Sequence, residues 1–111
     1  MDNSAEKLLN TLGMARRAGV LVVGQDNVFS EIKRHVSMLV ITASDCSAAV
    51  LRSAAPHAER GEARIITLKD TDRSVLGRYI GIGAAQIVAL PAGCGFAKKL
   101  LSLYDRSDAN E

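Results

Sequence analysis

The chain has 111 residues, 48% of them hydrophobic and 23% charged, which fits one globular domain and excludes a second domain or disorder as the main state. No apolar run approaches the roughly 20 residues that cross a bilayer, and the acidic start lacks a secretory signal, so we expect a single cytoplasmic domain, 1–111, away from membranes. The net charge of +2 is by itself weak support for a nucleic-acid partner.

The first half of the chain predicts two helices and two strands. A helix is expected over 3–17, where apolar residues recur every three or four positions and Asn3 and Glu6 have the spacing of a capping box. A second helix is expected over 25–35. Apolar, β-branched-rich runs predict strands at 20–23 and 38–43.

The second half continues the same alternation. A third helix is expected to be capped by Ser44 or Asp45 and ended by Pro56. Further strands are predicted at 64–68 and 86–90, and further helices at 72–79 and 95–104. The folded core is therefore expected to span about 5–104, with a loose tail over 105–111.

Strands and helices alternate along the whole chain. Such alternation is typical of a sheet covered by helices on both faces. We therefore predict an α/β fold, a three-layer α/β/α sandwich around a central, mostly parallel, mixed four-stranded sheet.

The sequence carries no recognised catalytic motif, neither a GxSxG elbow, a phosphate-binding loop nor HExxH. His35 and His57 fall at predicted helix ends, where an exposed imidazole facing the C-terminal dipole is the ordinary explanation. Cys46 and Cys94 are far apart and have no His at ligand spacing, so we expect two reduced thiols and no metal. We predict no catalytic residue, no cofactor and no enzymatic activity.

The segment around Gly24 joins a predicted strand to a helix that begins with amides and hydroxyls, at Gln25, Asn27 and Ser30. Free backbone N–H groups at a helix start favour phosphate or carbonyl partners, and Asn and Gln can pair with base edges. A simple N-cap made by Asp26 or Asn27 explains the same pattern, so both interpretations stay open.

The glycine-rich segment 77–83 follows a helix rather than a strand, which excludes a dinucleotide-binding fingerprint. A helix end and a turn explain Gly81. The two glycines on either side of the apolar Ile82, expected to be exposed, favour a surface loop that a partner can approach closely.

Five segments together resemble a known family. They are LGMARRAG at 12–19, GQDN at 24–27, LVITASD at 39–45, LGRYIGIG at 76–83 and GFAKKLLSLY at 95–104. Their order and spacing are similar to those of the kink-turn-binding ribosomal protein family, which includes the large-subunit proteins seven-Ae and thirty-e, and in particular to its small bacterial, YlxQ-like branch. The resemblance covers about residues 5 to 104.

The resemblance implies an α/β/α sandwich that grips a sharply bent RNA helix. In the family, the strand-to-helix turn reads sheared G·A pairs, and the opposite loop packs on an extruded nucleotide. Taking the residues and the resemblance together, we expect RNA contacts at Gly24, Gln25, Asp26, Asn27, Ser30, Lys33, Arg34, Arg16, Arg17, Ile82, Gly83 and Ala84.

The chain departs from the family pattern in the turn. Asp26 stands where the family has Asn, Asn27 where it has Glu, and Ser30 where it has Lys. We expect a monomer that binds structured RNA, with ribosomal RNA among the candidates. Two alternatives stay open: a protein-binding scaffold of the same fold that has lost the RNA site, and the recognition part of an RNA-modifying enzyme.

Overall fold

A computed structural model describes residues 3–34 and 37–109. Its strands are β1 (Val22–Val23), β2 (Met38–Thr42), β3 (Ala63–Thr67) and β4 (Ile87–Pro91). Its helices are α1 (Ser4–Arg17), α2 (Gln25–Arg34), α3 (Ala48–Glu59), α4 (Arg73–Ile80) and α5 (Gly95–Ala109). Within these ranges no helix combines the length and the apolar character that crossing a membrane requires.

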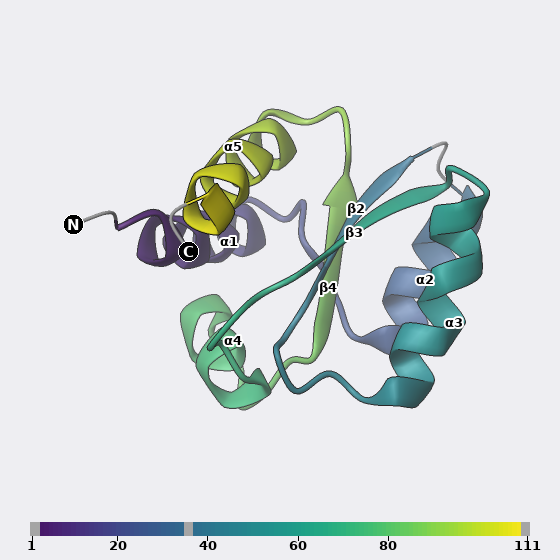
Figure 1. The fold of residues 1–111 in the computed structure, drawn as a ribbon, viewed down its shortest axis with the longest axis horizontal. Helices are drawn as coiled ribbons and strands as arrows, with labels where there is room; N and C mark the ends of the chain where they lie inside the picture. Colours follow the sequence, from purple (N-terminus) through teal and green to yellow (C-terminus); the bar gives the residue numbers. More distant parts are fainter. Residues whose placement is uncertain (1–2, 35–36, 110–111) are drawn as a thin grey trace.

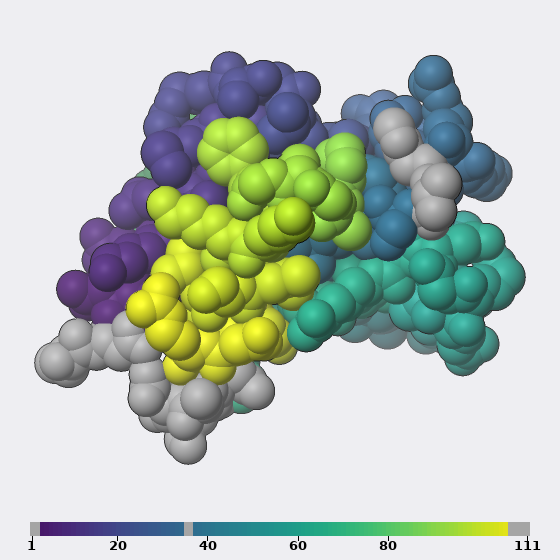
Figure 2. Space-filling view, turned by 90° about the horizontal axis from the view of Figure 1, so that it is seen from above, coloured from purple at the N-terminus to yellow at the C-terminus, as the bar shows by residue number. Residues whose placement is uncertain are grey.

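The central strand β2 is buried along its whole length, as its continuous apolar run predicts. Because side chains alternate across a strand, Met38 and Val40 enter one apolar cluster and Leu39 and Ile41 the other. The two clusters lie on opposite faces of the sheet. Helices α1, α4 and α5 cover one face, and α2 and α3 cover the other (Figure 1). Seen from above, α5 in yellow lies against α1 in purple (Figure 2).

The strand order is β1–β4–β2–β3, with β2 and β3 parallel and β4 antiparallel to both of its neighbours. The three-layer sandwich and the mixed four-stranded sheet are thus confirmed, but the mostly parallel pairing is wrong. Strands β1, β2 and β3 run in one direction, and β4 inserts between β1 and β2 against them, so two of the three pairs are antiparallel. In this register Val23, at the end of β1, pairs with Val88 at the start of β4.

Helix α3 begins and ends later than its sequence suggests. Its cap is Ser47, whose hydroxyl accepts a hydrogen bond from the Val50 N–H at 3.2 Å, whereas Asp45 binds Arg73. Pro56 lies inside the helix, which continues to Glu59, so the prediction that this proline ends it is wrong. Pro56 is exposed, and water can therefore serve the carbonyl that its missing N–H leaves without a partner.

The two ends of the chain correct two smaller predictions. Asn3 is the N-cap of α1, but its side chain forms no capping hydrogen bond, because its backbone lies outside the extended region that a capping box needs. The predicted loose tail is wrong for residues 105–109, because α5 runs on to Ala109. Its buried residues Ala97, Leu100 and Leu103 belong to the core, and the helix continues beyond them to Ala109.

His57 is a packed residue of α3 and not the exposed imidazole that the sequence suggests. Its side chain is 14% exposed, and its ring stacks on Phe29 of α2 with 5.8 Å between the ring centres. Its Nδ1 hydrogen-bonds Oε1 of Glu62 at 2.7 Å, and the Arg60 guanidinium donates to both oxygens of the same carboxylate. These bonds join the end of α3 to the start of β3.

This cluster gives the fold a pH dependence on the acid side. The hydrogen bonds from Arg60 and His57 lower the pKa of Glu62 from 4.5 to about 2 in the folded protein. Between these two pH values Glu62 binds more protons in the unfolded chain than in the folded protein. The stabilisation of the fold by Glu62 is therefore complete above pH 4.5 and is lost as the pH falls towards 2. Chemical denaturation across this range should show a flatter pH dependence for Glu62→Gln than for the wild type. Glu59→Gln, outside these hydrogen bonds, should leave the dependence unchanged; an equal flattening there would contradict the assignment.

Candidate nucleic-acid interface

The turn between β1 and α2 is built around Gly24. Its φ of +94° lies in the left-handed region, which glycine adopts without strain. Its N–H donates to the Ile87 carbonyl at 3.1 Å, and its own carbonyl accepts from the Val28 N–H at 2.9 Å. The turn is therefore fixed to the start of β4, and the N–H groups of the first turn of α2 have no acceptor within the helix.

The loop between α4 and β4, residues 81–86, reaches the same end of the sheet. It leads directly into Ile87, the residue that binds Gly24. The carbonyl of Gln86 accepts from the Ala43 N–H at 2.9 Å, which fastens the loop to the end of β2. The antiparallel pairing of β1 with β4 thus brings the predicted turn and the predicted loop together at one end of the sheet (Figure 1).

An open groove of about 440 Å³ runs between α1 and α2 beside this turn. Four of the predicted site residues line it, and the remaining lining residues come from β1, its approach and α2. The lining residues are Arg16, Leu21, Val22, Val23, Asn27, Ser30, Glu31 and Arg34. Three of these residues, Leu21, Val22 and Val23, are apolar and the other five are polar or charged, so the groove can meet both a base and phosphates.

Two arginines set the charge of the groove. Arg34 lies at the end of α2 with 74% of its side chain exposed, and it pairs with Glu31 at 3.4 Å. Arg16 is also exposed, and its Nη1 donates to the Ile80 carbonyl at 3.0 Å. Glu31 was missed as a groove residue, although its i,i+3 spacing from Arg34 is a recognisable signal in the sequence.

Asn27 contributes to both the turn and the groove. Its Nδ2 donates to the carbonyl of Val23 at 3.1 Å, which ties the first turn of α2 to the end of β1. An amide has two N–H donors and a carbonyl acceptor, so one N–H and Oδ1 can still meet a base edge. The side chain is exposed at the groove.

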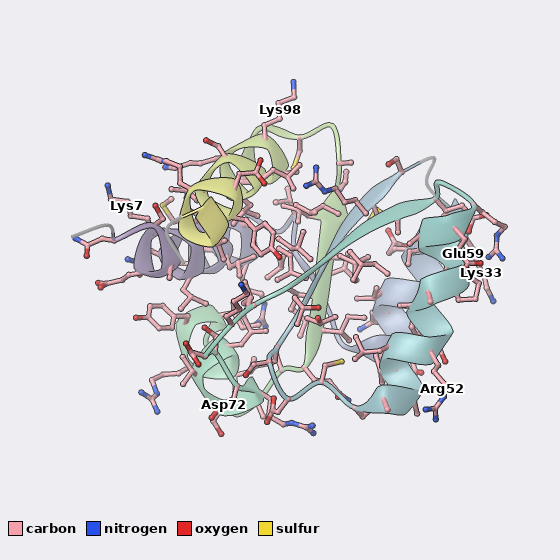
Figure 3. The ribbon with its side chains drawn as sticks, viewed as in Figure 1. Lys7, Lys33, Arg52, Glu59, Asp72 and Lys98 are labelled. Atoms are coloured by element: carbon pink, nitrogen blue, oxygen red, sulfur yellow. The ribbon has the colours of Figure 1, made fainter. Side chains whose placement is uncertain are left out.

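Other predicted residues lie outside the lining of the groove. Lys33 is exposed on α2 and does not line the groove (Figure 3). Gln25 and Asp26 are exposed in the first turn of α2, and Arg17 is exposed on α1.

The predicted contact residues of the loop 81–86 differ in their exposure. Gly83 and Ala84 are exposed, as expected for a contact loop. Ile82 is half-buried and packs against the core beneath α4, so the prediction that it is exposed is wrong. Its apolar side chain holds the loop on the protein, and the neighbouring backbone forms the outer surface.

The two thiols and the other potential metal ligands are spread over the described part of the fold. Burial raises the pKa of the Cys46 thiol, which lowers its reactivity near neutral pH. Cys46 and Cys94 are unpaired and follow strands β2 and β4, which are antiparallel, so they lie at opposite ends of the sheet, too far apart for a disulfide. Within 3–34 and 37–109 no three His, Cys, Asp or Glu side chains are grouped to hold a metal ion. His35 lies outside the described residues.

A model of the ribosomal protein L7Ae/L30e/S12e/Gadd45 family matches residues 6–100. With the sandwich and the groove described above, this match shows that the chain belongs to that family. The resemblance inferred from the five sequence motifs is confirmed.

Individual proteins are similar to this chain over most of its length. The RNA-binding protein YlxQ of Bacillus subtilis (strain 168) is 36% identical over 94 residues, which cover 85% of this chain and 91% of YlxQ. A protein of unknown function from Bacillus halodurans C superimposes with a TM-score of 0.79 at 27% identity, covering 89% of this chain and 97% of that one. The Giardia lamblia 15.5kD RNA binding protein shares the fold, with a TM-score of 0.75 at 14% identity over 98% of this chain and 91% of its own.

Proposed function

We propose that this chain binds structured RNA that is sharply bent or carries bulged nucleotides, as a kink-turn does, and catalyses no reaction. The observation that carries the proposal is the groove beside the Gly24 turn, which combines apolar lining residues with the two arginines Arg16 and Arg34. Bulged bases expose edges and faces that paired bases hide, so a groove of this kind can accept them. YlxQ, a relative over most of the chain, is named as an RNA-binding protein.

In this proposal the groove makes two kinds of contact with RNA, one to phosphates and one to a base. Arg34 and the N–H groups at the start of α2 meet phosphates, and Asn27 meets a base edge. The exposed backbone at Gly83 and Ala84 packs against a nucleotide that leaves the stack. The protein acts as a cytoplasmic monomer, and ribosomal RNA is among its candidate partners.

A direct comparison of two RNAs tests the proposal. Fluorescence titration should show tighter binding to a kink-turn RNA than to a fully paired duplex of the same length and charge. Equal affinity for the two would remove the proposed recognition of bent RNA. Crosslinking in cells, followed by sequencing of the attached RNA, should then identify the natural partner.

The second candidate is a scaffold domain that binds protein. It is favoured by the negative charge beside the groove, where Asp26 is exposed and Glu31 pairs with Arg34. A scaffold should show no preference between the two RNAs, and crosslinking should recover no enriched RNA.

The salt dependence of binding should identify Arg34 as a phosphate contact. Arg34→Ala removes one positive charge, so the log–log slope of affinity against salt should become shallower by about one unit. All RNAs should weaken alike, because a phosphate contact carries no sequence information. Titrations at several salt concentrations measure the slope. Arg106→Ala, an exposed arginine of α5 on the opposite face of the sheet, is the matched control. The same change of slope in both variants would mean that only net charge matters.

A further inference from the structure

The loop that faces the Gly24 turn is held by backbone hydrogen bonds at both ends. The Ile82 N–H donates to the Gly77 carbonyl at 2.8 Å, and the Ala85 N–H donates to the Arg73 carbonyl at 3.0 Å. Gly81 ends α4 in the left-handed conformation, with φ of +88°. The loop therefore folds back over α4 in one defined position.

Gly77 lets the loop approach α4 this closely. A Cβ atom at position 77 would lie 2.6 Å from Cα and 2.7 Å from the backbone nitrogen of Ala84. Real Cβ atoms do not approach backbone so closely, and backbone cannot rotate away as a side chain can. Any side chain at position 77 would therefore displace the loop at Ala84.

Helix α1 holds the end of α4 from the other side. Arg16 donates from Nη1 to the Ile80 carbonyl at 3.0 Å. A Cβ at Gly13 would lie only 2.6 Å from the carbonyl oxygen of Tyr79, so the backbones of α1 and α4 are in close contact here. The last carbonyls of a helix have no partner within it, and a cation beside them is favourable. Arg16 thus stabilises the end of α4 just before the loop begins.

Arg16 also lines the groove together with Asn27 and Arg34. One side chain therefore lines the groove beside residues of α2 and also hydrogen-bonds the end of α4, where the loop begins. We propose that Arg16 and Gly77 are positioning residues: they fix the loop 81–85 relative to the Gly24 turn before RNA binds. This inference rests on the proposed function and deepens it. A loop set in advance loses little conformational freedom on binding, so RNA of the matching shape binds more tightly.

The test compares two variants with two matched controls. Arg16→Met keeps the aliphatic stem and removes the donor, and Lys7→Met removes the same charge at an exposed position of α1 that does not line the groove. Gly77→Ala introduces the close contact, and Gly93→Ala adds the same methyl group where nothing lies within 4 Å. Circular dichroism checks that each protein is folded. Amide hydrogen exchange in the RNA-free protein then reports on the N–H groups of Ile82 and Ala85.

In Arg16→Met and Gly77→Ala, exchange at these two amides should be faster by roughly tenfold or more, as expected for a loop that opens locally. Affinity for the kink-turn RNA should fall by about tenfold in both variants. The salt slope should be unchanged in Gly77→Ala, because no charge has been removed. Lys7→Met and Gly93→Ala should leave exchange at both amides as in the wild type.

Two results would overturn the inference while the proposed function stands. If exchange at both amides is unchanged in Arg16→Met and Gly77→Ala, these residues do not position the loop. If exchange is faster but the RNA affinity is that of the wild type, the position of the loop does not govern recognition. If the wild-type protein does not distinguish the kink-turn from the duplex, both the proposed function and this inference are overturned. This outcome is seen with the wild-type protein alone, before any variant is made.

Discussion

Replacing Asp26 with Asn and Ser30 with Lys in one protein should tighten binding to a standard kink-turn RNA by roughly thirtyfold, or about 2 kcal/mol. Asp26 is exposed in the first turn of α2, and Ser30 lines the groove one turn further along the helix. The double change removes a negative charge beside the RNA phosphates and adds a positive one. At a protein surface each change is worth about 1 kcal/mol, which together give the expected effect.

Competition titrations with a labelled kink-turn RNA measure this change. The matched control is Asp105→Asn with Ser102→Lys, two exposed positions on α5 across the sheet, which gives the same change of net charge. It should tighten binding far less, because screening weakens charges that lie beyond about 10 Å. If affinity for the double variant stays flat or falls while the protein remains folded, RNA does not dock at the Gly24 turn, and the scaffold function becomes the better explanation.

Asn27→Ala should cost about 1–3 kcal/mol on the preferred RNA, a loss of roughly five- to 150-fold, and leave the salt slope unchanged. The side chain is uncharged, so no counterion release is lost with it. It offers a donor and an acceptor at the groove beyond the bond to Val23, and a lost base-edge pair weakens only the RNA that supplies that edge.

The measurement is affinity for the preferred RNA and for a variant RNA with the contacted base changed. Asn10→Ala, an exposed asparagine on α1 that does not line the groove, should leave both affinities unchanged. Thermal unfolding of Asn27→Ala checks the bond to Val23 separately. If Asn27→Ala weakens both RNAs equally, Asn27 acts by holding the turn to β1 rather than by reading a base.

The local pattern of the sequence determined most of the secondary structure. Most helices and strands begin and end within a few residues of their predicted positions. The signals that predict them, such as the apolar run at β2 and the amphipathic periodicity of α1 and α2, come from residues that are neighbours in the chain. The same local signals placed Gly24 before a helix start and so located the turn. The five motifs identified the family, which requires only order and spacing.

Several local predictions failed where a distant partner decided the outcome. Asp45 could have capped α3, but Arg73, far along the chain, binds it, and Ser47 caps the helix instead. Pro56 is a helix breaker by propensity, yet α3 continues to Glu59, where His57 and its neighbours are tied to Phe29 and Glu62. Packing between elements outweighs propensities of about 3 kcal/mol or less.

The sequence by itself determined which elements exist, the sandwich class, the family and the half of the candidate site that lies on one helix, at Asn27, Ser30 and Arg34. Only the tertiary structure decided that β4 inserts between β1 and β2, and that Arg16 of the groove hydrogen-bonds the end of α4, just before the loop 81–85. The reason is physical. Helical periodicity acts over three or four residues, whereas strand order and the bond between Arg16 and Ile80 depend on how separate elements share one core.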